Sequence, residues 1–160
     1  MGYQIPLPLV DGRSTGMYAC VTKSSLRRSG SSPDSDSARD KLSGYADAQK
    51  YAQNALGLDP SSTINACHLI GDSLGGSGDD QQSLATCFRG VNSFDRTPGD
   101  RGYSNMASME GLVRAAARQG QSVSYTVIPY YASDESKVPY AFELSAEGVY
   151  SNGATGLYER

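Results

Sequence analysis

A short apolar strand runs into a glycine-rich loop at Asn65-Ala66-Cys67-His68-Leu69-Ile70-Gly71, and this stretch carries the only histidine of the chain. Imidazole titrates near neutral pH, so histidine is the usual side chain for moving protons there. Because the chain has one histidine, its mechanism either uses His68 or does without this residue type. A structural His68, satisfied by backbone hydrogen bonds, is the alternative interpretation.

Size and composition predict one domain, residues 1–160. The chain is 38% hydrophobic and 19% charged, with 18 glycines, which is typical of a globular but loop-rich protein. It contains no run of about 18 apolar residues that could span a membrane. The segment 1–6 lacks the basic start and apolar stretch of a signal peptide. We therefore expect either a cytosolic protein or a mature or excised domain.

The net charge and the spacing of the cysteines argue against some classes of function. A net charge of −3 argues against a broad nucleic-acid-coating surface, but it leaves room for a local site that handles phosphate through a metal ion. Cys20, Cys67 and Cys87 have no C-x-x-C spacing, so we expect no structural zinc site. One disulfide with one free thiol and three reduced cysteines both fit this pattern.

Outward from His68, the sequence predicts strands clustered around two helices. The expected strands are 13–22, 65–70, 84–88 (ending near Asn92), 123–131 and 138–145, and the expected helices are 47–56 and 106–118. Residues 1–12 read as an extended lead-in, 29–37 as a flexible polar loop, and 149–157 as a turn with a last short strand. This order predicts an α+β domain.

The glycine-rich loop does not have the context of a phosphate-binding loop. The residues Gly75-Gly76-Ser77-Gly78 lead into a polar loop and a strand rather than into a helix. A phosphate cradle needs the helix, because its first backbone N–H groups face the phosphate. We therefore do not assign nucleotide binding to this loop.

Three polar side chains follow one another in a chemically coherent order. His68 closes one expected strand, Asn92 follows the next, and Glu110 lies on the helix 106–118. An imidazole, an amide oxygen and a carboxylate suit hydrolysis assisted by a hard cation, and oxygen ligands favour Mg²⁺ or Ca²⁺ over Zn²⁺. The blander alternatives are a turn role for Asn92 and a solvated helix position for Glu110.

An ordered set of segments over about residues 62–150 resembles the DNA/RNA non-specific endonucleases. This family has a ββα-metal (His-Me) finger and includes secreted streptococcal DNases and bacterial toxin domains. The segment 11–16 also resembles the family's Gly-Arg-x-Thr lead-in. The main matching segments are Asn65–Gly71, Leu74–Gly78, Ser83–Cys87, Val91–Ser93, Met109–Arg114 and Val123–Tyr131.

The resemblance implies a central antiparallel sheet and a finger of strand, loop, strand and helix that carries the active site. It makes His68 the general base that activates water, and Asn92 the ligand of one Mg²⁺ ion, with Mn²⁺ or Ca²⁺ as alternatives. Glu110 would hold a metal-bound water. The metal would stabilise the developing charge and the leaving 3′-oxygen, and the products would carry 5′-phosphates.

The chain departs from the family pattern in front of its histidine. Relatives often have Arg-Gly or Asp-Arg-Gly there, whereas this chain has Asn65-Ala66-Cys67. Positive charge for the transition state must therefore come from elsewhere, and Arg13 and Arg89 are the main candidates, with Arg114 the weakest. Gln82-Ser83 stands where relatives often have an asparagine, which removes an expected supporting hydrogen bond.

The functional expectation is a Mg²⁺-dependent, non-specific endonuclease acting on DNA, with RNA left open as a second substrate. The alternative is a non-catalytic α+β binding module in which His68 is structural. A narrower reading of the enzyme hypothesis is a secreted toxin domain with an immunity or inhibitor protein as its partner. No membrane partner is expected.

Overall fold

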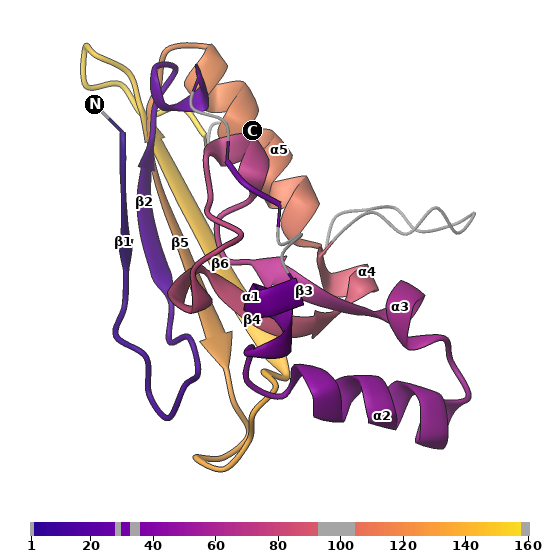
Figure 1. Cartoon of the computed structure of the whole chain (residues 1–160). Helices are drawn as coiled ribbons and strands as arrows, with labels where there is room; N and C mark the ends of the chain where they lie inside the picture. Colours follow the sequence, from indigo (N-terminus) through magenta and orange to yellow (C-terminus); the bar gives the residue numbers. More distant parts are fainter. Residues whose placement is uncertain (1, 28–29, 33–35, 93–104, 158–160) are drawn as a thin grey trace.

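The computed structural model describes residues 2–27, 30–32, 36–92 and 105–157, and their strands form two antiparallel sheets (Figure 1). The larger sheet has the order β1-β2-β5-β6, and the smaller sheet pairs β3 with β4. The strands are β1 (Tyr3–Pro6), β2 (Met17–Val21), β3 (Ile64–His68), β4 (Leu84–Phe88), β5 (Ser122–Tyr130) and β6 (Ala141–Val149).

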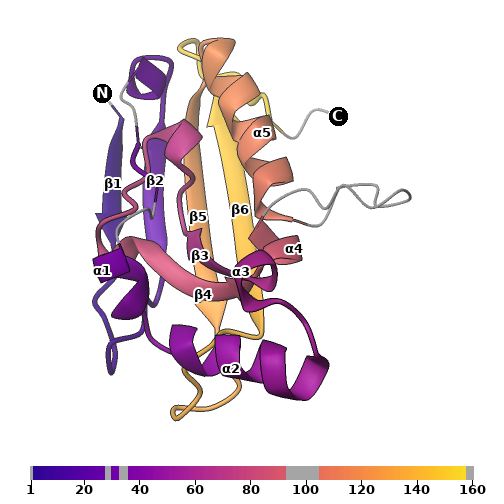
Figure 2. The same ribbon diagram turned by 45° about the vertical axis from the view of Figure 1, so that its right-hand side comes forward.

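The helices and the smaller sheet lie on one face of the larger sheet, with α5 running along β5 and β6 (Figures 1 and 2). The α-helices are α1 (Asp36–Asp40), α2 (Tyr45–Leu56), α3 (Pro60–Thr63), α4 (Arg89–Asn92) and α5 (Met106–Arg118). Three short 3₁₀ turns are η1 (Ser25–Arg27), η2 (Asp72–Leu74) and η3 (Gln81–Ser83). Among the described residues, none of the helices has the length and apolar character needed to cross a membrane.

The main core lies between the larger sheet and α5. Alternation along β5 buries Val123, Tyr125 and Val127 on the face that meets the helix. Cys67 and Cys87 from the smaller sheet join the same core. Among the described elements, no helix lies on the opposite face of the larger sheet in either view (Figures 1 and 2).

A second, smaller core holds α1 and α2 against the other face of the β3–β4 sheet. Ala38 and Leu42 meet Ile64, Ala66 and Leu84 there. Since successive side chains on a strand point to opposite faces, Cys67 faces the main core and His68 faces the side of α1 and α2. The smaller sheet is therefore a buried platform with His68 at its end.

The expected α+β fold with its antiparallel sheet is confirmed. The helix 106–118 has the predicted bounds, because Asn105 caps it by accepting a hydrogen bond from the Ser108 N–H, and Gly120 follows it at φ 94°. The helix expected at 47–56 begins two residues earlier, at Tyr45, and Gly57 ends it in a left-handed conformation.

Other boundaries differ from expectation. The lead-in contains β1, and the strand expected from Arg13 begins at Met17 because Val10 and Arg13 bridge across a tight turn. The strand expected to end near Asn92 stops at Phe88, where the chain enters α4.

The polar loop and the C-terminal part also differ from expectation. The strand expected at 138–145 lies at Ala141–Val149, and the last short strand is a single bridge between Val149 and Thr155. Of the loop expected at 29–37, residues 29 and 33–35 lie outside the described residues, and α1 begins at Asp36.

Candidate active site

A cleft of about 550 Å³ opens beside the end of β3. It is bounded by the smaller sheet, by α1 and by α4. Its lining includes His68, Asp72, Arg39, Arg89 and Asn92. Three of the five site residues expected from the sequence (His68, Arg89 and Asn92) therefore share one concave surface.

The contact that defines His68 is a hydrogen bond from its imidazole to the backbone of a distant segment. Its Nε2 atom lies 2.7 Å from the Ser31 carbonyl oxygen. A carbonyl oxygen can only accept, so Nε2 carries the proton and, in the neutral ring, Nδ1 holds the lone pair. His68 is thus oriented by a hydrogen bond and still has a basic nitrogen.

Glu110 lies behind the cleft, on the first turns of α5. Its carboxylate accepts a hydrogen bond from the Gly71 N–H and lies so close to the Gly71 Cα that a Cβ there would collide with it. Burial raises the pKa of Glu110 to about 7; the Gly71 N–H opposes this shift, the Asp72 charge adds to it, and Arg114 opposes it. Gly71 thereby connects Glu110 to the loop that follows His68.

Arg89 and Asn92 come to the cleft on α4, the single helical turn that directly follows β4. Positions three apart on a helix lie on the same side, which is why both side chains reach one cleft. The sequence-based expectation of a strand ending near Asn92 missed this turn, although it placed Asn92 after the second strand of the pair.

Arg39 is a cleft residue that the sequence reasoning did not identify. It lies on α1, and α1 is brought to the cleft because its neighbours Ala38 and Leu42 pack against β3. No motif surrounds Arg39, so its place at the cleft depends on packing between segments far apart in the chain. Asp72, the first residue of η2, was likewise not singled out.

Arg13, expected from the sequence to supply charge to the site, is not among the residues that line the cleft. It is buried in the turn region beside β5 and β6, where its Nη1 atom donates to the carbonyls of Ser133 (3.1 Å) and Ser136 (2.8 Å). Its guanidinium also stacks over the Tyr131 ring at 4.8 Å. These contacts give Arg13 a structural role.

The cysteines resolve the two alternatives that their spacing left open. Cys67 and Cys87 form a disulfide across β3 and β4, and Cys20 is free. Because Cys67 lies in the main core, facing away from His68, the pair cannot act as a Cys-His dyad.

The donor set around the cleft fits a hard cation with few protein ligands. Among the described residues there is no group of three or more His, Cys, Asp or Glu side chains that could hold a metal. The amide of Asn92 and the carboxylate of Asp72 supply oxygen donors at the cleft. An ion such as Mg²⁺ keeps several waters and needs only one or two protein ligands, so these residues suit it.

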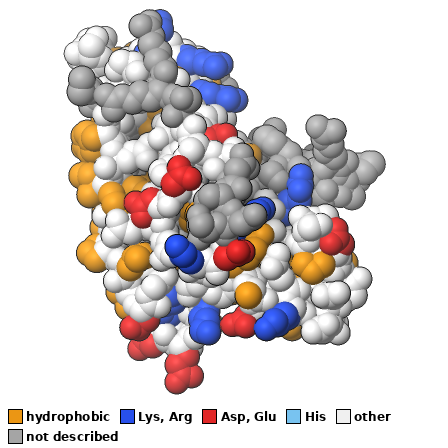
Figure 3. Space-filling view, in the orientation of Figure 1, with side chains coloured by type: hydrophobic (Ala, Val, Ile, Leu, Met, Phe, Trp, Pro, Cys, Tyr) orange, Lys and Arg blue, Asp and Glu red, His pale blue; other side chains and the backbone are white. Residues whose placement is uncertain are grey.

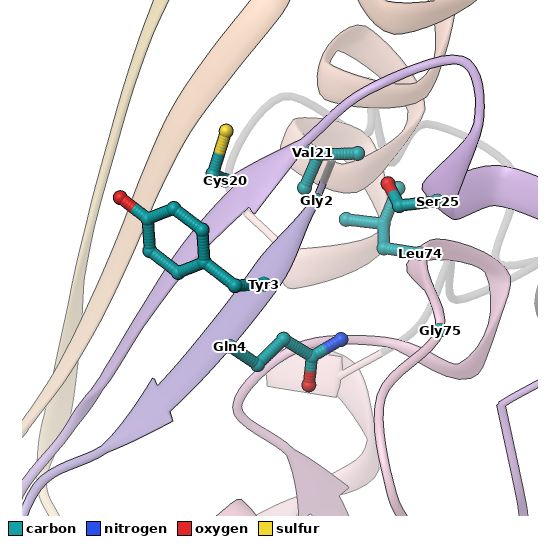
Figure 4. Close-up of a pocket in the computed structure, with 8 residues that line it drawn as sticks. All are labelled: Gly2, Tyr3, Gln4, Cys20, Val21, Ser25, Leu74 and Gly75. Atoms are coloured by element: carbon teal, nitrogen blue, oxygen red, sulfur yellow. The ribbon is translucent and has the colours of Figure 1, made fainter.

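Elsewhere on the described part of the molecule, the charged side chains and a second hollow differ in character from the cleft. Figure 3 shows acidic and basic side chains interspersed on one face, without a continuous basic surface. A second hollow, of about 170 Å³, lies beside Tyr3, Gln4 and Cys20, with Leu74 on its other side (Figure 4). It contains neither the histidine nor an arginine, so the cleft at His68 is the candidate active site.

Sequence comparison gives one family match. Residues 35–149 match the model of a family described as DNA/RNA non-specific endonuclease. No curated protein sequence matches the chain.

Several solved structures share the fold. NucA from Streptococcus agalactiae without metal gives a TM-score of 0.67 at 20% identity, covering 92% of this chain and 65% of that one, and it has also been solved with a magnesium ion bound. Sda1 nuclease with a bound zinc ion gives 0.62 at 21% identity, covering 94% and 71%. A structure described as an extracellular endonuclease gives 0.66 at 17% identity, covering 100% and 71%. The chain thus spans 65% of the NucA structure.

Proposed function

The chain belongs to the DNA/RNA non-specific endonuclease family, and from this premise we propose that it is a metal-dependent endonuclease that hydrolyses phosphodiester bonds of DNA. The observation that carries the proposal is the arrangement of the cleft. An oriented imidazole with a free nitrogen shares it with an amide oxygen donor and two arginines, at His68, Asn92, Arg39 and Arg89.

His68 acts in this proposal as the general base. Its Nδ1 atom takes a proton from a water molecule as the water oxygen attacks phosphorus and the bond between phosphorus and the leaving 3′-oxygen breaks. The hydrogen bond from Nε2 to the Ser31 carbonyl holds the ring in place and stabilises the positive charge that the ring gains. A backbone carbonyl is neutral, so it can orient the ring without taking up the Nε2 proton itself, as a carboxylate could.

Asn92 would hold Mg²⁺ through its side-chain oxygen, with Mn²⁺ or Ca²⁺ as alternatives and waters completing the coordination. When bound, the cation supplies charge stabilisation to the phosphate and to the leaving 3′-oxygen. Glu110 would accept a hydrogen bond from one of the coordinated waters. Its burial and the hydrogen bond that it accepts from the Gly71 N–H support this proposed role.

Arg89 and Arg39 would contact the phosphate charge from two sides of the cleft. Arg89 comes from α4 and Arg39 from α1. Arginine suits phosphate because its planar guanidinium presents several N–H donors and stays charged at all relevant pH values. Together they supply the positive charge that relatives obtain from an arginine just before the histidine.

Two observations support a secreted setting. A disulfide between Cys67 and Cys87 persists in oxidising compartments, and one structure of the same fold is described as an extracellular endonuclease. We extend the proposal accordingly to a secreted enzyme or toxin domain with an inhibitor protein as a further partner. RNA is included as a second substrate to be tested.

The decisive experiment incubates supercoiled plasmid and a structured RNA with wild-type protein and with His68→Ala, in Mg²⁺ and in EDTA. We expect cleavage only by the wild type in Mg²⁺, with the variant reduced by at least about a hundredfold because general-base catalysis is lost. Arg118→Gln, at the exposed end of α5, is the control and should keep full activity.

Full activity of His68→Ala with an unchanged circular dichroism spectrum would overturn the mechanism. Absence of cleavage by the wild type with Mg²⁺, Mn²⁺ and Ca²⁺ would instead favour the non-catalytic binding module. The hydrogen bond between His68 and Ser31 is the observation compatible with that second function.

A further inference from the structure

The segment that contacts His68 is seated on the glycine-rich loop rather than on the strand that carries His68. The N–H and the hydroxyl of Ser31 make three contacts, and all three are with residues 76–79 of that loop. The Ser31 N–H donates to the Gly76 carbonyl at 3.1 Å, and its hydroxyl donates to Asp79 Oδ2 at 3.0 Å. The same hydroxyl oxygen accepts from the Gly78 N–H at 2.8 Å.

Glycines make this close seating sterically feasible. A Cβ on Gly30 would clash with the Gly76 carbonyl oxygen and with the backbone of Asp72. A Cβ on Gly76 would overlap the Ile70 carbonyl, which is backbone and cannot move aside cheaply. The glycine-rich loop therefore has a use that the phosphate-cradle motif does not explain, namely close backbone packing against residues 30–31.

The loop is also fixed from its other end. The Gly76 N–H donates to the Gly71 carbonyl at 3.0 Å, and Gly71 in turn donates to Glu110. Hydrogen bonds therefore link Ser31 through Gly76 and Gly71 to Glu110. A change at Ser31 should reach the imidazole through the carbonyl that the imidazole contacts.

We propose that Ser31 is a positioning residue whose side chain, clamped by Asp79 and Gly78, presents its own carbonyl to His68 and fixes the ring in the Nε2–H tautomer, with Nδ1 directed to chemistry. We name this set of contacts, Ser31 with Gly76, Gly78 and Asp79, the Ser31 latch. The proposal rests on the proposed nuclease function only for its activity readout.

The single histidine allows a direct test, because every imidazole signal in the ¹⁵N spectrum belongs to His68. In the neutral ring, at alkaline pH, the wild type should show Nε2 protonated and Nδ1 unprotonated. Ser31→Ala removes both side-chain contacts and should shift the spectrum toward a mixture of tautomers, as should Asp79→Ala. Ser31→Thr keeps the hydroxyl and should restore the wild-type pattern, and Ser73→Ala, an exposed serine of η2 outside the latch, is the control.

Nuclease kinetics give the second readout. We expect Ser31→Ala to lower kcat about tenfold with little change in KM, as is typical when a partner that orients a functional histidine is removed. A wild type in the Nδ1–H tautomer, or a Ser31→Ala spectrum identical to wild type, would overturn the proposal. A tautomer shift in a protein without nuclease activity would leave the latch standing and remove the proposed function.

Discussion

At the scale of single residues, Glu110 carries an energetic cost that follows from its position. A carboxylate loses hydration when it is buried, and the Gly71 N–H and Arg114 compensate for only part of that loss. Burial therefore raises the pKa of Glu110 to about 7 from a usual value of 4.5. A bound cation nearby would lower this cost, so the cost of burying the carboxylate is expected to be largest in the metal-free protein.

This cost predicts a pH dependence of stability. Below about pH 4.5 the carboxyl group is protonated in both folded and unfolded states, and its contribution to stability is fully present. As pH rises through about 7, the unfolded state releases the proton first, and that contribution is lost. In EDTA, the free energy of unfolding of the wild type should fall relative to Glu110→Gln by up to about 3 kcal/mol over this window. Urea unfolding across the window measures it, and a gap that stays constant with pH would contradict it.

The residues of the site were predictable to different degrees for physical reasons. His68, Asn92 and Glu110 could be chosen because each follows or lies on an element with a clear local pattern. Arg39 and Ser31 could not, because only packing between distant segments brings them to the cleft. Arg13 lies outside the cleft lining, since a charge near a motif does not reveal which carbonyls its guanidinium will contact.

At the scale of elements, the β3–β4 sheet places the site residues relative to one another. His68 ends β3, while Arg89 and Asn92 belong to the helical turn that follows β4. Any sliding between the two strands would separate the imidazole from Asn92. The disulfide between Cys67 and Cys87 links the two strands close to His68 and to α4, and the Cα atoms of the two cysteines are 5.9 Å apart.

We therefore predict that reduction weakens the protein through this sheet. The two cysteines are 20 residues apart in the sequence. A disulfide that closes a loop of this size typically stabilises the folded protein by about 3 kcal/mol. Adding a reductant should lower the Tm of the wild type by roughly 6–12 °C. Differential scanning fluorimetry measures this shift, and nuclease activity should fall at temperatures between the two transitions.

Two variants test whether this disulfide is responsible. The double variant Cys67→Ala/Cys87→Ala should have a low Tm that the reductant no longer changes. Cys20→Ser, which alters the free cysteine, should keep the full response to the reductant. An equal response in the double variant would show that the reductant acts elsewhere.

The elements with local signals were those that the sequence predicted well. The helix α5 has an apolar stripe, a side-chain cap at Asn105 and a glycine after its end, so its bounds could be predicted. The expected bounds of β6 were shifted from the observed ones. Its exposed positions include glutamates, and its extent is determined by pairing with β5 over nine residues. The turn into α4 at Arg89 gave no local signal, since its four residues are stabilised by contacts with β3 and β4.

At the scale of the whole molecule, the charge distribution constrains how a nucleic acid is held. The net charge is −3, and basic and acidic side chains are interspersed on the face in Figure 3. Such a surface gives little non-specific attraction to a polyanion at long range. In the proposed function, we expect affinity to come from the cleft, whose lining includes both Arg39 and Arg89.

This reasoning predicts a shallow salt dependence of DNA binding. Each phosphate neutralised by a basic side chain contributes about −0.9 to the slope of log K against log salt, so two arginines give a slope of roughly −2. Fluorescence anisotropy of a short labelled duplex, with His68→Ala in EDTA to prevent cleavage, measures the slope. Arg39→Gln and Arg89→Gln should each make it less steep by about one, whereas Arg118→Gln, which removes the same charge from the exposed end of α5, should leave it unchanged. An equal effect of all three variants would mean that binding responds to the charge of the whole surface, and the cleft would lose its special role in holding the substrate.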